Sequence, residues 1–418
     1  MRRPALVLSA VLFLAAAAWC PPVPGLEDRL LALALDHDPV VAGPARAQLR
    51  AEGPSTFAEI LARCSSGTRP ASDWDEALDM IAQQRGSRHC GLYWYTDLAA
   101  AERAAAQSGK PILALHLLGR LTDERSCANS RFFRSILYTN RAVADYLRGN
   151  VVLYWHSERP VPQVTIDFGD GRRIETTIAG NCVHYLLDAE GRPLDALPGL
   201  YGPSEFLTQL RTDCAMHHQW RAADRDHRPA LLTAFHQEQL EAMRVALFSV
   251  GGAPETEIPS MVAWAVAPIA ASESLAVSKC GVEAPVLKAV RLWREPAAVD
   301  GMTGWVSMLA DMHPEFGRLD AASTSLIRSR LADGRDADND LANLALSLAR
   351  DTVQDEYILH TLIHRQFVDG GAKDLQTLDR WVYDRLFLTP ESDPWLGLLP
   401  PGYDGLDHNG IVVVGAKR

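Results

Sequence analysis

Residues 109–130 read GKPILALHLLGRLTDERSCANS, and the rest of the fold is inferred outward from this segment. The short apolar run over residues 112–118 predicts a buried strand. An Ala-rich helix is expected just before it, over residues 98–108, and an amphipathic helix just after it, over residues 131–148. Cys127 therefore falls at the start of a helix that follows a buried strand.

Cys127 is the residue in this segment with the chemistry of a nucleophile. At a helix start, unpaired N–H groups and the positive end of the helix dipole stabilise a thiolate, which lowers the pKa of the thiol. Arg125 and Arg131 flank Cys127 and act in the same direction. The alternative is that Cys127 is a small buried hydrophobic residue.

Further strands are expected along the chain. Residues 150–155 predict a second strand, and residues 164–168 and 172–178 predict a β-hairpin around a Gly-containing turn. Residues 183–188 predict another strand, and Ser204 is expected to cap a final helix. A strand–helix–strand unit followed by a hairpin return predicts the α+β class, with a mixed sheet flanked by helices.

The hydrophobic period predicts three parts after the N-terminus. Residues 26–70 are expected to form a helical segment with a loop from about residue 64, and residues 91–212 the domain with the mixed sheet. Residues 229–418 are expected to form an all-helical C-terminal domain with an ordered tail. The sequence does not indicate what this helical domain does.

The composition excludes several classes of protein. The chain has 418 residues, of which 47% are hydrophobic and 22% charged, as in globular proteins with two or three domains of roughly 150 residues. The formal net charge of −11 repels phosphate, so no nucleic-acid partner is expected. The seven cysteines include no Cys-x-x-Cys pair, which argues against a small disulfide-stapled module.

The N-terminus predicts export. A short basic start and the apolar run over residues 5–18 are typical of a secretory signal, with cleavage expected after Ala18. The run is shorter than the about 20 residues of a membrane-spanning helix, and no second long apolar run follows. We expect a periplasmic or extracellular protein, where disulfides are permitted. The alternatives are an uncleaved N-terminal anchor and a lipoprotein modified at Cys20.

Part of the chain resembles the thioredoxin superfamily. The resemblance rests on Gly109-Lys110-Pro111-Ile112, the strand that follows, a Cys-x-x-Ser at a helix start, and Asn150-Val151-Val152-Leu153. It is nearest to members in which a Lys-Pro-Ile strand leads to the active-site Cys-x-x-Cys. It covers roughly residues 94–210, under a third of the chain, and implies a thioredoxin-like sheet for that part.

The resemblance also implies roles for three residues. Cys127 stands where the family has its attacking cysteine, and Ser130 stands where it has the resolving one. Cys182, counted back from Asp188, stands at the position of the cis-proline. The usual dithiol cycle cannot run on this motif alone, and the proline that holds a peptide substrate against the thiol is missing.

The replacement of the cis-proline leads to a hypothesis. In the family fold this loop lies against the attacking cysteine, so Cys182 is expected to reach Cys127. The pair would either cycle as a dithiol and disulfide or form a permanent bridge. Either arrangement needs Cα atoms within about 7 Å of each other.

Two groups of histidines carry a weaker signal. Glu356, His360 and His364 are spaced to share one helix face, and two histidines four residues apart can bind a metal ion. The segment lacks the His-Glu-x-x-His pattern, so we expect a solvent-facing helix surface and no metal or cofactor. Met216-His217-His218, near Cys214, has no ligand spacing and is also expected at the surface.

Two cysteines lie outside the motif. Export permits a structural disulfide between Cys64 and Cys90, whereas both are free thiols in the alternative.

Two functions from different classes remain open. The first is thiol–disulfide exchange with a protein partner, and the second is a redox-inactive thioredoxin-fold binding or scaffold protein. The sequence leaves the oligomeric state open. In the first function the site residues are Cys127, Ser130 and Cys182, supported by Arg125, Arg131 and Asn181.

Overall fold

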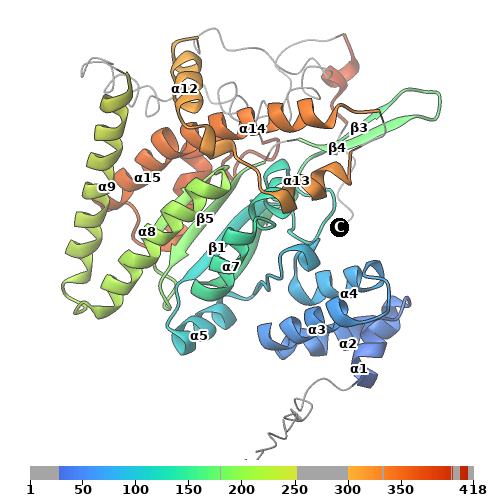
Figure 1. Ribbon diagram of the computed structural model, residues 1–418. Helices are drawn as coiled ribbons and strands as arrows, with labels where there is room; N and C mark the ends of the chain where they lie inside the picture. The colour runs from blue at the N-terminus through green and yellow to red at the C-terminus, as the bar shows by residue number, and fades with distance from the viewer. Residues whose placement is uncertain are drawn as a thin grey trace, which may run out of the picture.

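The computed structural model describes residues 28–178, 180–251, 300–331, 334–396, 398 and 405–412. The expected signal segment, Cys20 and Cys280 lie outside the described residues. Helices surround a small mixed sheet, so the chain is an α+β protein, as the sequence predicts (Figure 1). Among the described helices, none combines the length and the apolar character that a membrane crossing requires.

Four helices near the N-terminus pack around a core of their own. The Asp38 side chain caps the second helix, and Gly53, at φ 97°, turns the chain into the third. The third helix runs through Cys64, so the loop begins later than expected. The helices are α1 (Asp28–Ala34), α2 (Pro39–Ala51), α3 (Pro54–Ser66) and α4 (Ser72–Ala82). Their core includes Leu49, Phe57, Ile60, Leu78 and Ile81.

A four-stranded sheet lies at the centre of the remaining chain. Its strands are β1 (Ile112–Leu118), β2 (Val152–Arg159), β5 (Cys182–Leu187) and β6 (Pro193–Pro198), in the order β2-β1-β5-β6. β1 is parallel to β2 and antiparallel to β5, and β5 is antiparallel to β6. Every residue of β1 and β5 is buried, which explains their nearly continuous apolar runs. The three strands expected here are confirmed, and β6 is an additional one.

The helix expected over residues 131–148 is divided into pieces. The Asn140 side chain accepts the Val143 N–H at 3.2 Å and so caps a new helix inside the predicted one. The chain before Asn140 passes through a π-helical turn. The pieces are α6 (Ala128–Phe132), η2 (Phe133–Leu137) and α7 (Arg141–Asn150).

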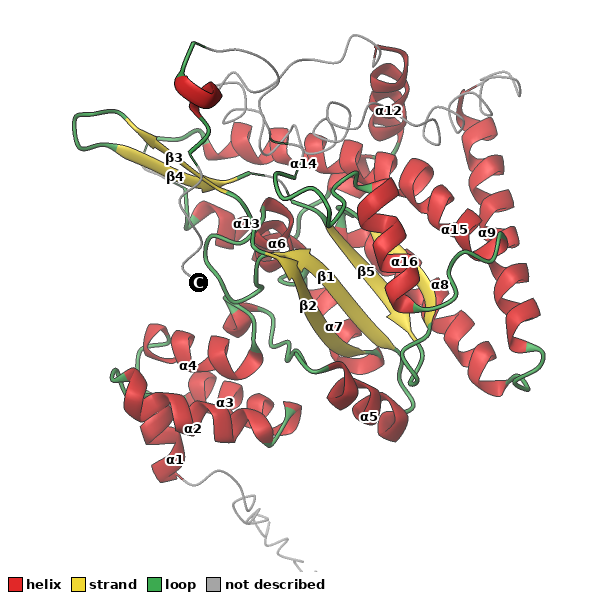
Figure 2. Cartoon of the chain, turned by 180° about the vertical axis from the view of Figure 1, so that it is seen from behind, coloured by secondary structure: helices red, strands yellow, loops and turns green. Residues whose placement is uncertain are grey.

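Helices cover both faces of the sheet (Figures 1 and 2). One face packs against α7 and α8 (Pro203–Ala222), and the other against α5 (Leu98–Ser108), α15 (Thr361–Val368) and α16 (Leu375–Trp381). Successive residues of β1 therefore alternate between two cores. The predicted helix α5 is confirmed, and it ends at Gly109 because that residue adopts φ 71°.

A β-hairpin projects from the body of the molecule (Figure 2). Its strands, β3 (Gln163–Asp167) and β4 (Arg173–Thr177), form a separate two-stranded sheet, as the Gly-containing turn predicts. Asp167 accepts the N–H of Gly169 at 2.9 Å at the turn. Phe168 and Ile174 are 52% and 47% exposed there.

The described chain after residue 229 is mainly helical, as expected. The helix that Ser204 was predicted to cap begins two residues earlier, at Pro203, with Gly202 at its N-cap position. The Ser204 hydroxyl instead donates to the Glu315 carbonyl at 2.9 Å. The remaining helices are α9 (Arg228–Gly251), α12 (Asp300–Met312), η3 (Pro314–Gly317), α13 (Ala321–Arg328), α14 (Ala337–Gln354), η4 (Asp355–His360) and η5 (Val382–Leu386), with the short turns η1 (Ser87–His89) and η6 (Asp407–Gly410).

Candidate functional site

Cys127 stands at a helix start. It is the N-cap residue of α6, and its Sγ accepts the Ser130 N–H at 3.4 Å. N–H donors and the positive end of a helix dipole favour the thiolate over the thiol. Cys127 has no exposed surface, however, and packs beside Leu118 in the core on the α16 face of the sheet.

The segment that carries Asn181 and Cys182 lies against this helix start. A Cβ atom on Gly180 would lie 3.0 Å from Asn129 Oδ1 and 3.4 Å from the Ala128 backbone nitrogen. The Asn129 side chain donates to the Cys182 Sγ at 2.8 Å. The two segments that carry the cysteines are therefore in contact through Asn129, two residues beyond Cys127.

The permanent disulfide between Cys127 and Cys182, one of the two expected arrangements, is absent, and the two residues pack into different clusters. Cys182 is completely buried in the core on the α7 and α8 face, whereas Cys127 belongs to the core on the α16 face. The Cys182 sulfur lies 3.4 Å from the Gly199 carbonyl oxygen, and it also accepts the hydrogen bond from Asn129. Cys182 is thus packed as a hydrogen-bonded core residue.

The supporting arginines turn toward the hairpin. Arg131 donates to the Thr177 hydroxyl at 2.9 Å, and Arg125 forms an ion pair with Glu175. The cation that packs on the helix start is Arg134, which donates to the Ser130 carbonyl at 3.3 Å. Burial lowers the pKa of Arg134 to about 10. The sequence could have indicated this role of Arg134, because Arg134 lies seven residues after Cys127, about two helical turns along the same face.

The C-terminal part of the chain covers the thiol site. The Asn181 side chain donates to the Thr389 hydroxyl at 2.7 Å, and the Tyr383 hydroxyl donates to the Asn181 carbonyl at 3.5 Å. Arg159 donates to the carbonyls of Thr389 at 2.6 Å and Asp393 at 2.9 Å. The start of the tail that the sequence predicts to be ordered is thus held against the sheet as far as Asp393, whereas residues 397, 399–404 and 413–418 lie outside the described residues.

Ion pairs of His116 with Glu158 and Asp379 hold α16 on the same face of the sheet. His116 Nδ1 on β1 lies 2.8 Å from Glu158 Oε1 and 2.9 Å from Asp379 Oδ1, and Tyr185 donates to the same Asp379 oxygen at 2.9 Å. Burial alone would lower the pKa of His116, but the hydrogen bonds and charges of Asp379 and Glu158 raise it to about 9. His116 is therefore protonated at neutral pH and fixes α16 to the sheet.

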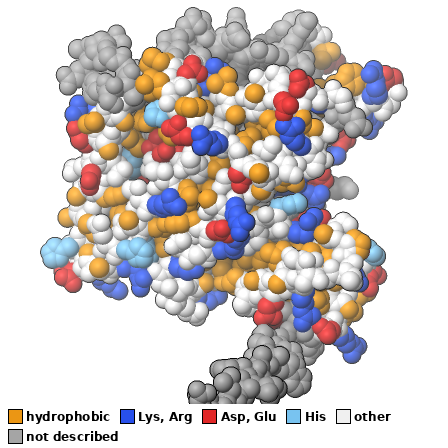
Figure 3. Space-filling view, in the orientation of Figure 1, with side chains coloured by type: hydrophobic (Ala, Val, Ile, Leu, Met, Phe, Trp, Pro, Cys, Tyr) orange, Lys and Arg blue, Asp and Glu red, His pale blue; other side chains and the backbone are white. Residues whose placement is uncertain are grey.

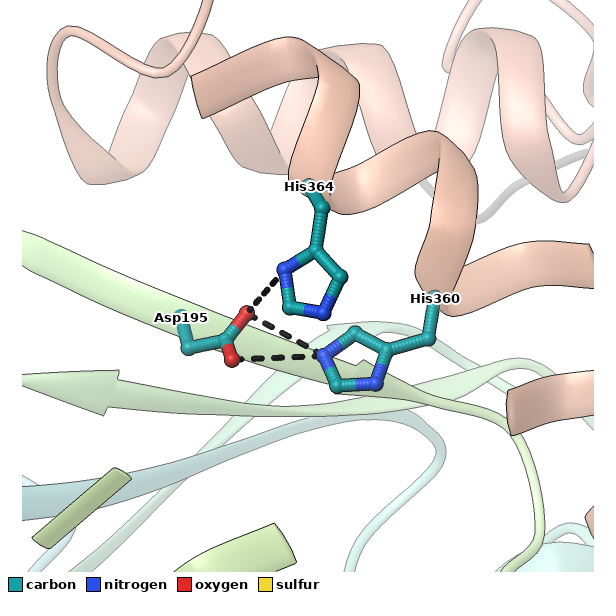
Figure 4. A group of neighbouring side chains, drawn as sticks. All are labelled: Asp195, His360 and His364. Atoms are coloured by element: carbon teal, nitrogen blue, oxygen red, sulfur yellow. Dashed lines mark hydrogen bonds and ion pairs between the residues drawn. The ribbon is translucent and has the colours of Figure 1, made fainter. Parts of the chain in front are cut away.

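A second polar cluster lies on the strand that the sequence did not predict. Asp195 of β6 faces His360 and His364, which come from one helical stretch (Figure 4). His360 Nε2 lies 3.2 Å from Asp195 Oδ1, and His364 Nδ1 lies 3.8 Å from the same oxygen. The solvent-facing surface expected for the two histidines is wrong, because both have no exposed surface. The helix packs against β6, which the helical period alone could not indicate.

Further contacts orient the rings of this cluster. His360 Nδ1 lies 3.2 Å from Glu356 Oε2, so the ring bridges two carboxylates. His236 Nε2 lies 3.0 Å from the Leu194 carbonyl oxygen, which can only accept, so that nitrogen carries the proton. His236 Nδ1 is then a lone-pair acceptor, and it lies 2.8 Å from His364 Nδ1.

Several carboxyl groups are buried around the cluster. Burial and then the charge of Asp195 raise the pKa of Asp213 well above its usual range. Burial and then Glu356 raise the pKa of Glu205 to about 7. Burial opposes ionisation of Asp195 as well, but the charges of His360 and His364 lower its pKa. Asp213 therefore carries no charge at neutral pH, and Asp195 is the ionised acid that faces His360 and His364.

Two weaker predictions have an outcome: Cys64 and Cys90 match the free-thiol alternative, and the surface position expected for His217 is wrong. Cys64 and Cys90 are buried free thiols, so the disulfide between them is absent. Burial raises the pKa of Cys90 to about 11, as expected for an unreactive core thiol. His217 is 1% exposed, whereas a surface position was expected, because α8 turns it toward the core.

Searches of protein-family models, curated proteins and solved structures find no match to this chain.

Proposed function

We propose that residues 91–212 form a thioredoxin-like domain and that the protein is a redox-inactive binding or scaffold protein. The order of elements supports the thioredoxin-like assignment: Cys127 starts the helix that follows β1, and the segment before β5 lies against that helix start. The strand after this helix is parallel to β1, and the two later strands are antiparallel.

The observation that carries the redox-inactive assignment is the burial of the thiols. Exchange requires the attacking sulfur to reach a partner's disulfide, and Cys127 and Cys182 both have no exposed surface. The Cys182 sulfur is also held by the Asn129 side chain at 2.8 Å and lies 3.4 Å from the Gly199 carbonyl oxygen, and these contacts would have to break before it could act as a resolving thiol.

We call the segment after η5, from Thr389 to Asp393, the cover of the thiol site, and specific contacts hold it in place. Asn181, beside Cys182 in the chain, is hydrogen-bonded to Thr389, and Arg159 binds the carbonyls that follow η5. Hydrogen bonds that involve a charged group contribute about 1.5–3 kcal/mol. Such contacts favour a closed resting state over a loosely placed tail.

The β3–β4 hairpin supports a binding role. It projects from the body and exposes Phe168 and Ile174, with the Arg172 guanidinium 5.3 Å from the centre of the Phe168 ring. Figure 3 shows acidic and basic side chains interspersed on this face, with no large area of one sign. An exposed two-stranded ribbon with mixed charge fits a protein partner better than a nucleic acid.

Thiol exchange after opening of the cover is the second candidate. The Ser130 N–H at the Cys127 sulfur favours it, because this donor stabilises a thiolate. The Cys127 thiolate would attack a partner's disulfide, form a mixed disulfide and release the partner's other sulfur as a thiolate. An external thiol would then attack the mixed disulfide and free Cys127.

Reduction of insulin by dithiothreitol distinguishes the two functions. We expect the full chain to leave the rate at its uncatalysed value, and Cys127→Ser to behave like the wild type. Cys214→Ser is the matched control, because Cys214 is a buried free cysteine outside the thiol site. Acceleration that is lost in Cys127→Ser and kept in Cys214→Ser would establish the exchange function instead.

A further inference from the structure

We propose that Asp195, His360 and His364 bind a divalent transition-metal ion of the zinc class. One carboxylate oxygen and two imidazole nitrogens form a ligand set typical of Zn²⁺. In the part of the chain that the structure describes, their donor atoms all lie within 4.8 Å of one another, and the three residues are buried. This site is independent of the thiols and of the proposed binding role.

The donor spacing fits a common ion. Ligands at about 2.0–2.1 Å from a tetrahedral ion lie roughly 3.3 Å from each other. Asp195 Oδ1 lies 3.2 Å from His360 Nε2 and 3.8 Å from His364 Nδ1. A small movement of the His364 ring would bring all three donors to the coordination distance.

The backbone holds the three ligands from two elements. His360 and His364 are one helical turn apart, so their rings lie on one face, with centroids 4.1 Å apart. Asp195 approaches this face from β6, as Figure 4 shows. β6 is buried along its whole length, and the helical stretch is buried from His360 to His364.

The outer contacts are those that metal-bound histidines usually make. A ligating imidazole directs its other nitrogen to a carboxylate or a carbonyl, which fixes the tautomer. His360 directs Nδ1 to Glu356, which leaves Nε2 for an ion. His236 directs Nε2 to the Leu194 carbonyl and presents its Nδ1 lone pair next to His364. Because His364 would bind the ion through Nδ1, the lone pair on His236 Nδ1 is placed to serve as a fourth ligand.

The charge of the surroundings also favours a cation. Asp195 and Glu356 flank His360: Asp195 Oδ1 lies 3.2 Å from Nε2, and Glu356 Oε2 lies 3.2 Å from Nδ1. Buried carboxylates are stable when paired with cations or bound to a metal ion. Without an ion, the imidazole of His360 is the group that faces both carboxylates.

Metal analysis of the purified full chain tests the site directly. Protein expressed with added zinc is expected to retain one ion per chain after gel filtration, measured by inductively coupled plasma mass spectrometry. Because the donors are buried, the apoprotein is prepared by unfolding in guanidinium with a chelator and is refolded with Co²⁺. We expect one Co²⁺ per chain with the intense visible absorption of tetrahedral coordination.

Variants locate the ion. His364→Gln and Asp195→Asn are expected to lose the bound metal, and Glu356→Gln to weaken binding by about 10- to 100-fold, as outer contacts do. His217→Gln is the matched control, because it changes a buried histidine outside the cluster. Metal retained in both ligand variants would overturn the site. If the variants do not fold, a wild-type metal content far below one ion per chain would overturn it alone.

Discussion

Asp195 shows how one residue can hold distant parts of the chain together. It lies on β6, and its carboxylate contacts a histidine that is 165 positions away in the sequence. The sequence around it gave no strand signal, because Pro193 and Pro198 bound the segment and Asp195 interrupts its apolar residues. The local pattern predicts a loop, and only contacts with the distant helix make a buried aspartate acceptable there.

Asp195→Asn is predicted to destabilise the fold strongly. The substitution leaves the buried His360 imidazolium without one of its two carboxylates, and breaking a buried ion pair costs about 3–5 kcal/mol. Urea unfolding of both proteins in metal-free buffer measures the difference in the free energy of unfolding. A loss below about 0.5 kcal/mol, the usual size for surface substitutions, would mean that the cluster does not support the fold.

The raised pKa of His116 predicts that the stability of the fold decreases at alkaline pH. Its pKa is raised to about 9 in the folded protein by the facing groups Asp379 and Glu158, against about 6.5 when unfolded. Its contribution is therefore complete below pH 6.5 and is lost as the pH rises through 9, by about 3 kcal/mol in total.

The measurement compares His116→Gln with the wild type by chemical unfolding across this pH range. We expect the stability difference between them to shrink steadily as the pH rises. A constant difference would show that His116 is neutral in the folded state.

At the scale of elements, apolar runs in the sequence predict the buried strands well, whereas the sequence does not predict where every helix begins and ends. β1 and β5 are buried on both faces, so their sequences predict strands almost residue for residue. The helix over residues 131–148 was predicted as continuous, because the apolar period carries through the cap at Asn140. Which face of α15 is buried could not be predicted, since leucine, isoleucine and histidine side chains are all buried there.

The cover predicts a local opening that substitution can promote. Arg159→Ala removes the donor to the Thr389 and Asp393 carbonyls, so the segment after η5 is expected to open more often. A loss of about 1.5–3 kcal/mol corresponds to roughly 10- to 100-fold faster alkylation of Cys127. Arg172→Ala, on the exposed hairpin, is the control and is expected to leave the rate unchanged. Equal rates in all three proteins would remove the assignment of this segment as the cover.

The exposed side chains of Phe168 and Ile174 on the hairpin are predicted to be dispensable for folding. Phe168→Ser with Ile174→Ser replaces side chains that are about half exposed, so the free energy of unfolding is expected to change by less than about 0.5 kcal/mol. Thermal and urea unfolding of the double variant check this. A larger loss would mean that the two side chains pack within the fold instead of being available to a partner.

At the scale of the whole molecule, the sequence predicts the α+β class but not the joining of its parts. The helices after residue 229 were expected as a C-terminal domain, and α15 and α16 pack directly on the sheet. This contact depends on pairs such as Asn181 with Thr389, which no local pattern links. Burial of Cys127, the feature on which the proposed function depends, is therefore a property of the assembled chain.

Export of the protein is also a prediction at the scale of the whole molecule. We expect the mature protein, secreted by a host with a matching export system, to begin at Trp19, after cleavage at Ala18. N-terminal sequencing of the secreted fraction checks this. Recovery of the uncleaved chain in the membrane fraction would favour the retained anchor, and lipid on Cys20 would favour the lipoprotein.

The central claim is that the thiol site is closed in the resting protein. Alkylation of the native full chain by iodoacetamide, followed at Cys127 by mass spectrometry, tests it most directly. We predict protection of at least about 1,000-fold relative to the guanidinium-unfolded chain, because modification must wait for opening of the cover. Stoichiometric labelling of Cys127 in the folded protein, at the rate of an exposed thiol, would contradict the claim.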